Sequence, residues 1–178
     1  MKRNRNNKGF SYVEMIVVLG IMSIMTAFIA LTLGTVNRNN VRRASESIQS
    51  KMNEARVSAM SKGTQRGYLM IARYNNNIYT YVGQGIDPTT GELYTAEAIS
   101  KRGEKLCSPK LNITVAGQEM NGDVGNVVYL QFKQSTGGLN NCSGTISGNQ
   151  VTVKVANDKD TMVSSFKIFT QSGKIKSE

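Results

Sequence analysis

Histidine and tryptophan are absent from this sequence of 178 residues, and proline occurs only twice. Histidine is the usual side chain for proton transfer near neutral pH and the commonest ligand of protein-bound zinc. Its absence removes Ser-His and Cys-His nucleophile pairs and histidine metal ligands. The sequence also offers no phosphate-binding loop and no cluster of metal-ligating residues. We therefore expect no enzymatic activity, no cofactor and no metal site.

Acidic residues are fewer than basic ones, 12 against 22, and the formal net charge is +10. Lys2, Arg3, Arg5 and Lys8 supply four of these charges before a long apolar run begins, which leaves +6 for the remainder. A balance of that size is compatible with many partners and identifies none by itself.

The apolar run extends from Met15 to Val36 and contains no formal charge. As a helix these 22 residues span about 33 Å, compared with about 30 Å for the hydrocarbon core of a bilayer. The run is longer than the apolar region of a secretory signal peptide, and no convincing A-x-A cleavage site follows it. A buried core helix would need apolar partners that the rest of the chain does not offer. The sequence predicts a transmembrane helix over residues 10–36.

Orientation follows from the basic leader, residues 1–9, which precedes this helix. Lys and Arg beside a first transmembrane helix keep that end on the cytoplasmic side. We therefore expect a single-pass protein of the cell membrane with a cytoplasmic N-terminus and an exported C-terminal part.

Apolar residues continue after the polar "NRNN" at helical spacing: Val41, Ala44, Ile48, Met52, Ala55 and Ala59. Steps of three and four place them on one face of an amphipathic helix over residues 37–63, which ends with Lys62 and Gly63. Because no proline occurs before Pro88, the two helical segments are predicted to join into one long helix.

Beyond Gly63 the pattern changes to short β-branched and aromatic runs separated by turn-rich pieces. "GYLMIAR" and "IYTYVG" flank "YNNN", which is typical of a hairpin. The fold class predicted is α+β: a long N-terminal helix, half transmembrane and half amphipathic, packed on a meandering antiparallel sheet in an exported domain of residues 64–178.

A basic leader ending in Gly9, then "FSYVE", then an apolar run resembles the class III signal of type IV pilins and type II secretion pseudopilins. In that family the prepilin peptidase cuts after the glycine and methylates the new N-terminus. A glutamate five residues into the mature chain is a hallmark of the family and acts in assembly. The resemblance implies cleavage between Gly9 and Phe10, an assembly role for Glu14 and a pilin-like fold.

The helix end "ESIQSKMNEARVSAMSKG" and the closing "FKIFTQSGKIK" are similar to the GspH/FimT-like branch of minor subunits. The resemblance implies a minor pilin or pseudopilin of a type IV pilus or type II secretion-like filament, at the cell surface or in the periplasm after assembly. Implied partners are other pilin or pseudopilin subunits, the prepilin peptidase and the inner or cytoplasmic membrane.

Three alternatives remain open at this point. The chain could be a major pilin, or a minor pilin for DNA uptake that binds DNA through Lys167, Lys174 and Lys176 near the C-terminus. The third alternative is a membrane-tethered binding domain of an unrelated family. Cys107 and Cys142 lie in loop-like surroundings of the exported part, and a disulfide between them is favoured over two free thiols. Such a bridge closes a loop of about 35 residues and contributes about 3 to 4 kcal/mol in the chain-entropy treatment.

Overall fold

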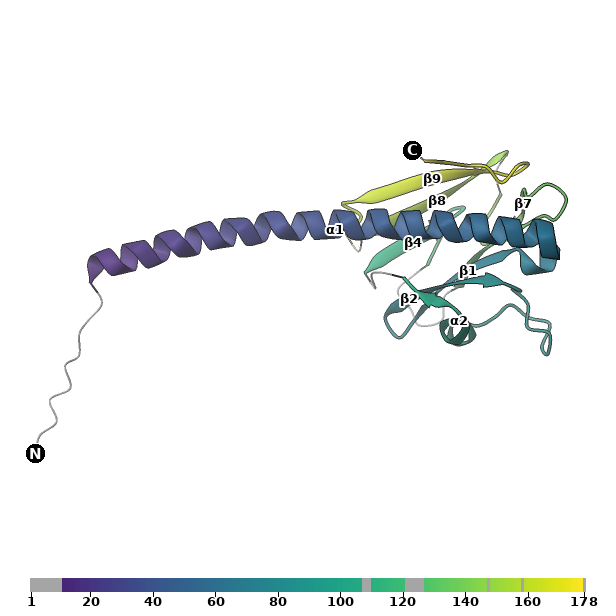
Figure 1. Ribbon diagram of the computed structural model, residues 1–178, viewed down its shortest axis with the longest axis horizontal. Coiled ribbons are helices and arrows are strands. Elements are labelled where there is room, and N and C mark those ends of the chain that lie inside the picture. Colours follow the sequence, from purple (N-terminus) through teal and green to yellow (C-terminus); the bar gives the residue numbers. More distant parts are fainter. Residues whose placement is uncertain (1–10, 107–109, 121–126, 147, 158, 178) are drawn as a thin grey trace, which may run out of the picture. The chain divides into compact units, whose positions relative to one another are not determined.

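The computed structural model describes residues 11–106, 110–120, 127–146, 148–157 and 159–177, with the backbone alone at residues 30–37. The chain divides into two compact units, residues 1–37 and residues 38–178. Helix α1 begins at Tyr12 in the first unit and ends at Lys62 in the second (Figure 1). The fold is α+β, with an N-terminal apolar helix and two antiparallel sheets.

The second unit contains two five-stranded antiparallel sheets, in the orders β3-β2-β1-β6-β7 and β10-β9-β8-β4-β5. In the first sheet the strands are β1 (Tyr68–Tyr74), β2 (Asn77–Gly83), β3 (Glu104–Lys105), β6 (Val127–Phe132) and β7 (Leu139–Cys142). In the second they are β4 (Leu111–Val115), β5 (Gln118–Glu119), β8 (Gln150–Asn157), β9 (Val163–Phe169) and β10 (Ile175–Ser177). A short 3-10 helix, η1 (Thr64–Arg66), connects α1 to β1.

The single meandering sheet predicted from the sequence is therefore wrong. The chain builds β1, β2 and β3, moves to the second sheet for β4 and β5, returns for β6 and β7, and then completes the second sheet. Alternation of apolar and polar residues identifies a strand, but it does not say which strand lies beside it.

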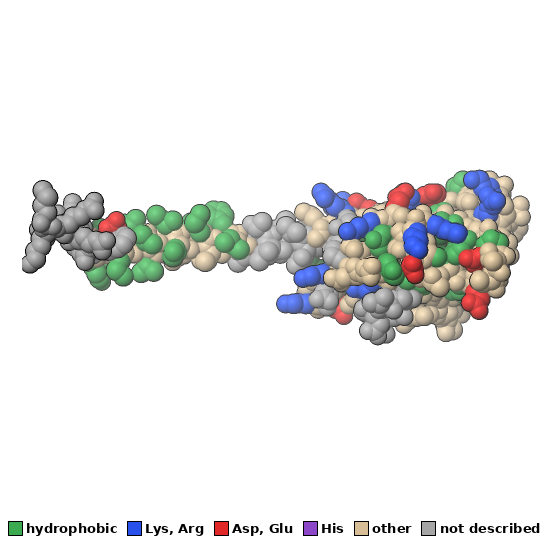
Figure 2. Space-filling view, turned by 90° about the horizontal axis from the view of Figure 1, so that it is seen from below, with side chains coloured by type: hydrophobic (Ala, Val, Ile, Leu, Met, Phe, Trp, Pro, Cys, Tyr) green, Lys and Arg blue, Asp and Glu red, His purple; other side chains and the backbone are tan. Residues whose placement is uncertain are grey.

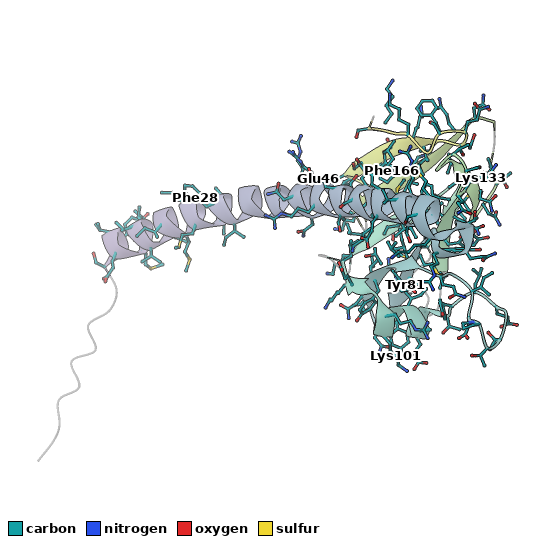
Figure 3. All side chains as sticks on the ribbon, turned by 45° about the vertical axis from the view of Figure 1, so that its right-hand side comes forward. Phe28, Glu46, Tyr81, Lys101, Lys133 and Phe166 are labelled. Carbon is teal, nitrogen blue, oxygen red and sulfur yellow. The ribbon has the colours of Figure 1, made fainter. Side chains whose placement is uncertain are left out.

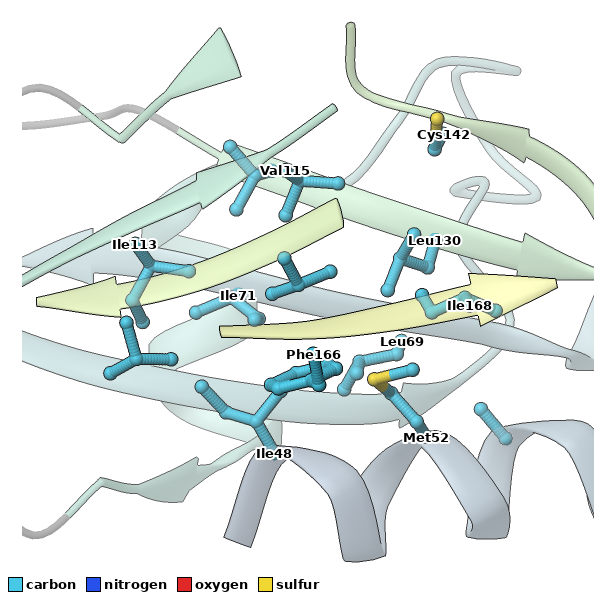
Figure 4. Close-up of a cluster of buried hydrophobic side chains, with 14 of the residues drawn as sticks. Ile48, Met52, Leu69, Ile71, Ile113, Val115, Leu130, Cys142, Phe166 and Ile168 are labelled. Carbon is cyan, nitrogen blue, oxygen red and sulfur yellow. The ribbon is translucent and has the colours of Figure 1, made fainter. Parts of the chain in front are cut away.

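The main core lies between helix α1 and the inner faces of both sheets. All six residues of the predicted helical stripe, Val41 through Ala59, are at most 4% exposed. Ile48 and Met52 point from α1 toward Phe166, Leu69 and Ile71 of the strands (Figure 4). The predicted amphipathic face is thus confirmed, and burying it fixes this half of α1 on the sheets.

A second, smaller core lies on the other face of the first sheet, beneath helix α2 (Ala96–Arg102). Met70 and Ala72 of β1 point into it together with Ile99 of α2 and Tyr94. Strand β1 is consequently buried on both faces, which explains its unbroken apolar "YLMIA".

Helix α2 was not predicted, because its seven residues are too few to display a helical period. Its local signals are a side-chain N-cap, in which Thr95 accepts a hydrogen bond from the Ala98 amide, and a Glu97–Lys101 ion pair one turn apart. The predicted hairpin is present: β1 pairs with β2 from Tyr68↔Gly83 to Tyr74↔Asn77 around Asn75 and Asn76, whose positive φ angles suit a two-residue turn.

Candidate functional surfaces

The first half of helix α1 exposes its apolar side chains. Over Tyr12–Ile29 the mean hydropathy is 2.1 and none of the residues is buried. Val13 and Phe28, for example, are each 67% exposed, and Figure 2 shows hydrophobic side chains along the visible face of this segment. By length and composition this helix can cross a membrane.

The polar side chains within this segment bond to their own helix. The Ser23 hydroxyl donates to the Leu19 carbonyl at 2.8 Å, and the Thr26 hydroxyl donates to the Met22 carbonyl at 2.9 Å. Both hydroxyl groups are therefore satisfied without water, as a lipid environment requires.

Glu14 lies in the first turn of α1, with its side chain exposed. An acidic group there interacts favourably with the partial positive charge at the helix N-terminus. No ion pair to Glu14 occurs within the described part of the chain. Gly9 and Phe10, the residues of the predicted cleavage site, lie outside the described residues.

The predicted disulfide is not tested, because Cys107 also lies outside the described residues. Cys142 ends β7, is 4% exposed and has no disulfide partner among the described residues. Burial raises the pKa of the Cys142 thiol, so a smaller fraction of it is ionised to the reactive thiolate near neutral pH.

The three lysines proposed for DNA contact lie at one side of the second sheet. Lys167 of β9 stands directly opposite Lys176 of β10, and Lys174 lies in the turn between these strands. Strand alternation places Lys154 of β8 and Phe169 of β9 on the same outer face as Lys167, because Thr152 pairs with Lys167. The sequence did not single out these last two residues, since only the pairing register reveals them.

Among the described residues there is no group of three or more Cys, Asp or Glu side chains that could hold a metal ion. Comparisons with protein-family models, with curated protein sequences and with solved structures find no match to this chain.

Proposed function

We propose that this chain is a membrane-anchored structural subunit, a minor pilin or pseudopilin, of a type IV pilus or type II secretion-like filament. The observation that carries the proposal is the exposed apolar helix of Tyr12–Ile29, which begins within the signal-like "KGFSYVE". A helix of this kind needs lipid or other chains around it, and a filament subunit uses both in turn.

The proposal assigns the amide bond between Gly9 and Phe10 to the prepilin peptidase. A residue without a side chain is expected at the cut, so Gly9→Val should block processing. The check is the intact mass of the chain extracted from membranes that contain such a peptidase. A mature chain that still carries Met1 in the parent protein contradicts the proposal.

Glu14 is assigned to assembly. Cleavage creates an amine at Phe10, and in an assembled filament the Glu14 carboxylate of one subunit pairs with the amine of its neighbour. Removing one partner of such a buried pair costs about 3 to 5 kcal/mol. Glu14→Ala is therefore expected to leave membrane insertion intact and to reduce incorporation into filaments strongly.

The matched control is Glu46→Ala, which removes an acid from the same helix. Glu46 is exposed and pairs with Arg42 at 2.8 Å, one turn away within the chain. Exposed pairs of this type contribute little to stability. Filament and membrane fractions are compared for both variants, and equal incorporation of Glu14→Ala and Glu46→Ala would refute the role of Glu14.

DNA binding is the second candidate function, and the observation that favours it is the common outer face of Lys154, Lys167, Lys176 and Phe169. Lysine contacts to phosphates release counterions, so binding should weaken steeply as salt increases. Lys154→Gln combined with Lys176→Gln should lower affinity for DNA and flatten its salt dependence. Unchanged binding by this double variant rules out the face.

A further inference from the structure

A groove of about 630 Å³ opens in the second unit, between the C-terminal part of α1 and the end of β2. Lys62, Arg66 and Arg102 contribute basic side chains to it, and Tyr81 and Tyr94 contribute aromatic ones. Figure 3 shows Tyr81 lying between helix α1 and helix α2, which carries Lys101. Neither the pilin resemblance nor the DNA hypothesis assigns any of these lining residues.

The groove carries excess positive charge. Its acidic lining residue, Glu54, is already paired with Lys51 at 3.1 Å, and Lys51 also contacts Glu104 at 3.0 Å. Within the described part of the chain, Lys62, Arg66 and Arg102 form no ion pair. Three cations from α1, η1 and α2 therefore converge on one concave surface, which favours an anionic ligand.

One of the three cations is held in place before any ligand arrives. The guanidinium carbon of Arg102 lies 4.3 Å from the centroid of the Tyr94 ring, and Tyr94 is only 5% exposed. The Tyr94 ring in turn meets Tyr81 edge-on, with centroids 6.0 Å apart. The attraction between the guanidinium and the ring favours this position, and guanidinium N–H groups are the donors that bind a carboxylate through two hydrogen bonds.

The groove also contains an open strand edge. Strand β2 pairs with β1 along its whole length but with β3 only at Tyr79 and Thr80. On that outer edge the Ile78 carbonyl accepts a hydrogen bond from the Leu106 amide. In an antiparallel strand the backbone N–H and C=O of every second residue point to the same edge. Val82 is four residues after Ile78, so its N–H and C=O point to this outer edge as well.

Val82 lies beyond the end of β3 and lines the groove. No described residue forms a backbone hydrogen bond with the outward N–H or C=O of Val82. Such an unpaired donor and acceptor form a place where an extended peptide can add to the sheet.

We propose that this groove binds an acidic, extended segment of a partner protein. The segment continues the line of β3 along β2 and forms two backbone hydrogen bonds with Val82. Its carboxylates contact Arg66 and Arg102, with Lys62 adding long-range attraction. The inference goes beyond the proposed function, because it holds whether or not the chain assembles into filaments.

A peptide fits this groove better than a single-stranded nucleic acid. Base stacking needs an accessible ring face, and of the two lining tyrosines Tyr94 is buried with Arg102 over its ring, which leaves only Tyr81 for such a contact. The outward N–H and C=O of Val82 match a peptide backbone, while a phosphodiester backbone offers no N–H donor to the carbonyl. The groove therefore supplies both parts of peptide recognition, a strand edge and charge complementarity.

The test uses the full chain in detergent micelles and a short fluorescent peptide of alternating Val and Glu, measured by fluorescence anisotropy at low salt. Three competitors are compared: the same peptide with Gln for Glu, the acidic peptide with alternate amides N-methylated, and a single-stranded oligonucleotide. The protein variants are Arg66→Gln with Arg102→Gln, and the control Arg43→Gln, which removes an exposed cation outside the groove.

We expect the Glu peptide to bind at least about tenfold more tightly than the Gln peptide, and the double variant to lose about the same factor. N-methylation that blocks the edge hydrogen bonds should weaken binding, and Arg43→Gln should leave it within about twofold. Far-UV circular dichroism checks that the variants are folded. Three results would overturn the proposal. The double variant could bind the Glu peptide as tightly as the parent protein does, or the parent could bind the Glu and Gln peptides equally. The oligonucleotide could also be the one competitor that displaces the fluorescent peptide.

Peptide binding is measured without filaments, so its failure leaves the proposed filament function standing. Conversely, loss of filament assembly in Glu14→Ala says nothing about the groove, because Glu14 belongs to the other unit.

Discussion

The packing of α1 against both sheets should contribute much of the free energy of unfolding of the second unit. Replacing Ile48 by alanine measures that contribution. Ile48 is fully buried in the main core and points toward Phe166 (Figure 4). Ile48→Ala deletes three carbon groups, worth about 2.4 kcal/mol at about 0.8 kcal/mol each. The cavity left between the helix and the strands raises the expected loss toward about 4 kcal/mol.

The assay is urea unfolding of a fragment of residues 38–178, followed by tyrosine fluorescence and far-UV circular dichroism. This fragment contains every residue of both cores, so it should fold without the first unit. A domain of this size has a total stability of about 5 to 15 kcal/mol. Ile48→Ala should therefore shift the unfolding midpoint to clearly lower urea.

The matched control is Val57→Ala, on the same helix but 64% exposed. Its free energy of unfolding should stay within about 0.5 kcal/mol of the parent value. A loss below about 1 kcal/mol for Ile48→Ala, or equal losses for both variants, refutes the claim that this stripe holds the helix on the sheets. A fragment that fails to fold refutes the independence of the second unit.

Three further predictions concern other parts of the second unit. Gly173→Ala should destabilise the fragment more than Gly117→Ala: both glycines have positive φ, but a methyl group at Gly173 meets the backbone carbonyl oxygen of Gly137, whereas that at Gly117 meets open space. Paired unfolding curves check this, and equal losses contradict it. Thr95→Ala should cost about 0.5 to 2 kcal/mol by removing the N-cap of α2, and no loss would show that this cap is dispensable. In the reduced, folded fragment, Cys142 should react with iodoacetamide more slowly than in the fragment unfolded in urea, because its side chain is buried. Burial also raises the pKa of the Cys142 thiol, so the free energy of unfolding should fall as the pH rises above about 8.5, where the thiol of the unfolded chain ionises. A free energy of unfolding that does not change with pH in this range contradicts the linkage.

The sequence predicted those features whose cause is local. The stripe from Val41 to Ala59 follows a period that only one face of a helix satisfies, and all six positions are buried. The β1–β2 hairpin follows from two apolar runs around the asparagines at positions 75 and 76, which tolerate positive φ. Both predictions needed no knowledge of distant partners.

The features that were missed depend on partners far apart in the sequence. Strands β6 and β4 have similar alternation, yet β6 joins β1 in one sheet and β4 joins β8 in the other. The candidate groove likewise combines Arg66, Val82 and Arg102, which no local motif connects. Its strand edge depends on where β3 stops, and β3 consists of only two residues.

Helix α1 faces two different surroundings along its length. From Val41 onward a narrow stripe is buried by the strands, and the remaining face carries charged residues such as Arg42 and Glu46 that suit water. Over Tyr12–Ile29 the large apolar side chains are exposed, and no part of this segment is buried. The second unit therefore completes its own core, whereas this segment must obtain its apolar contacts from lipid or from other chains. The filament subunit proposed above would supply that cover in both of its locations, first from a bilayer and then from the helices of neighbouring subunits.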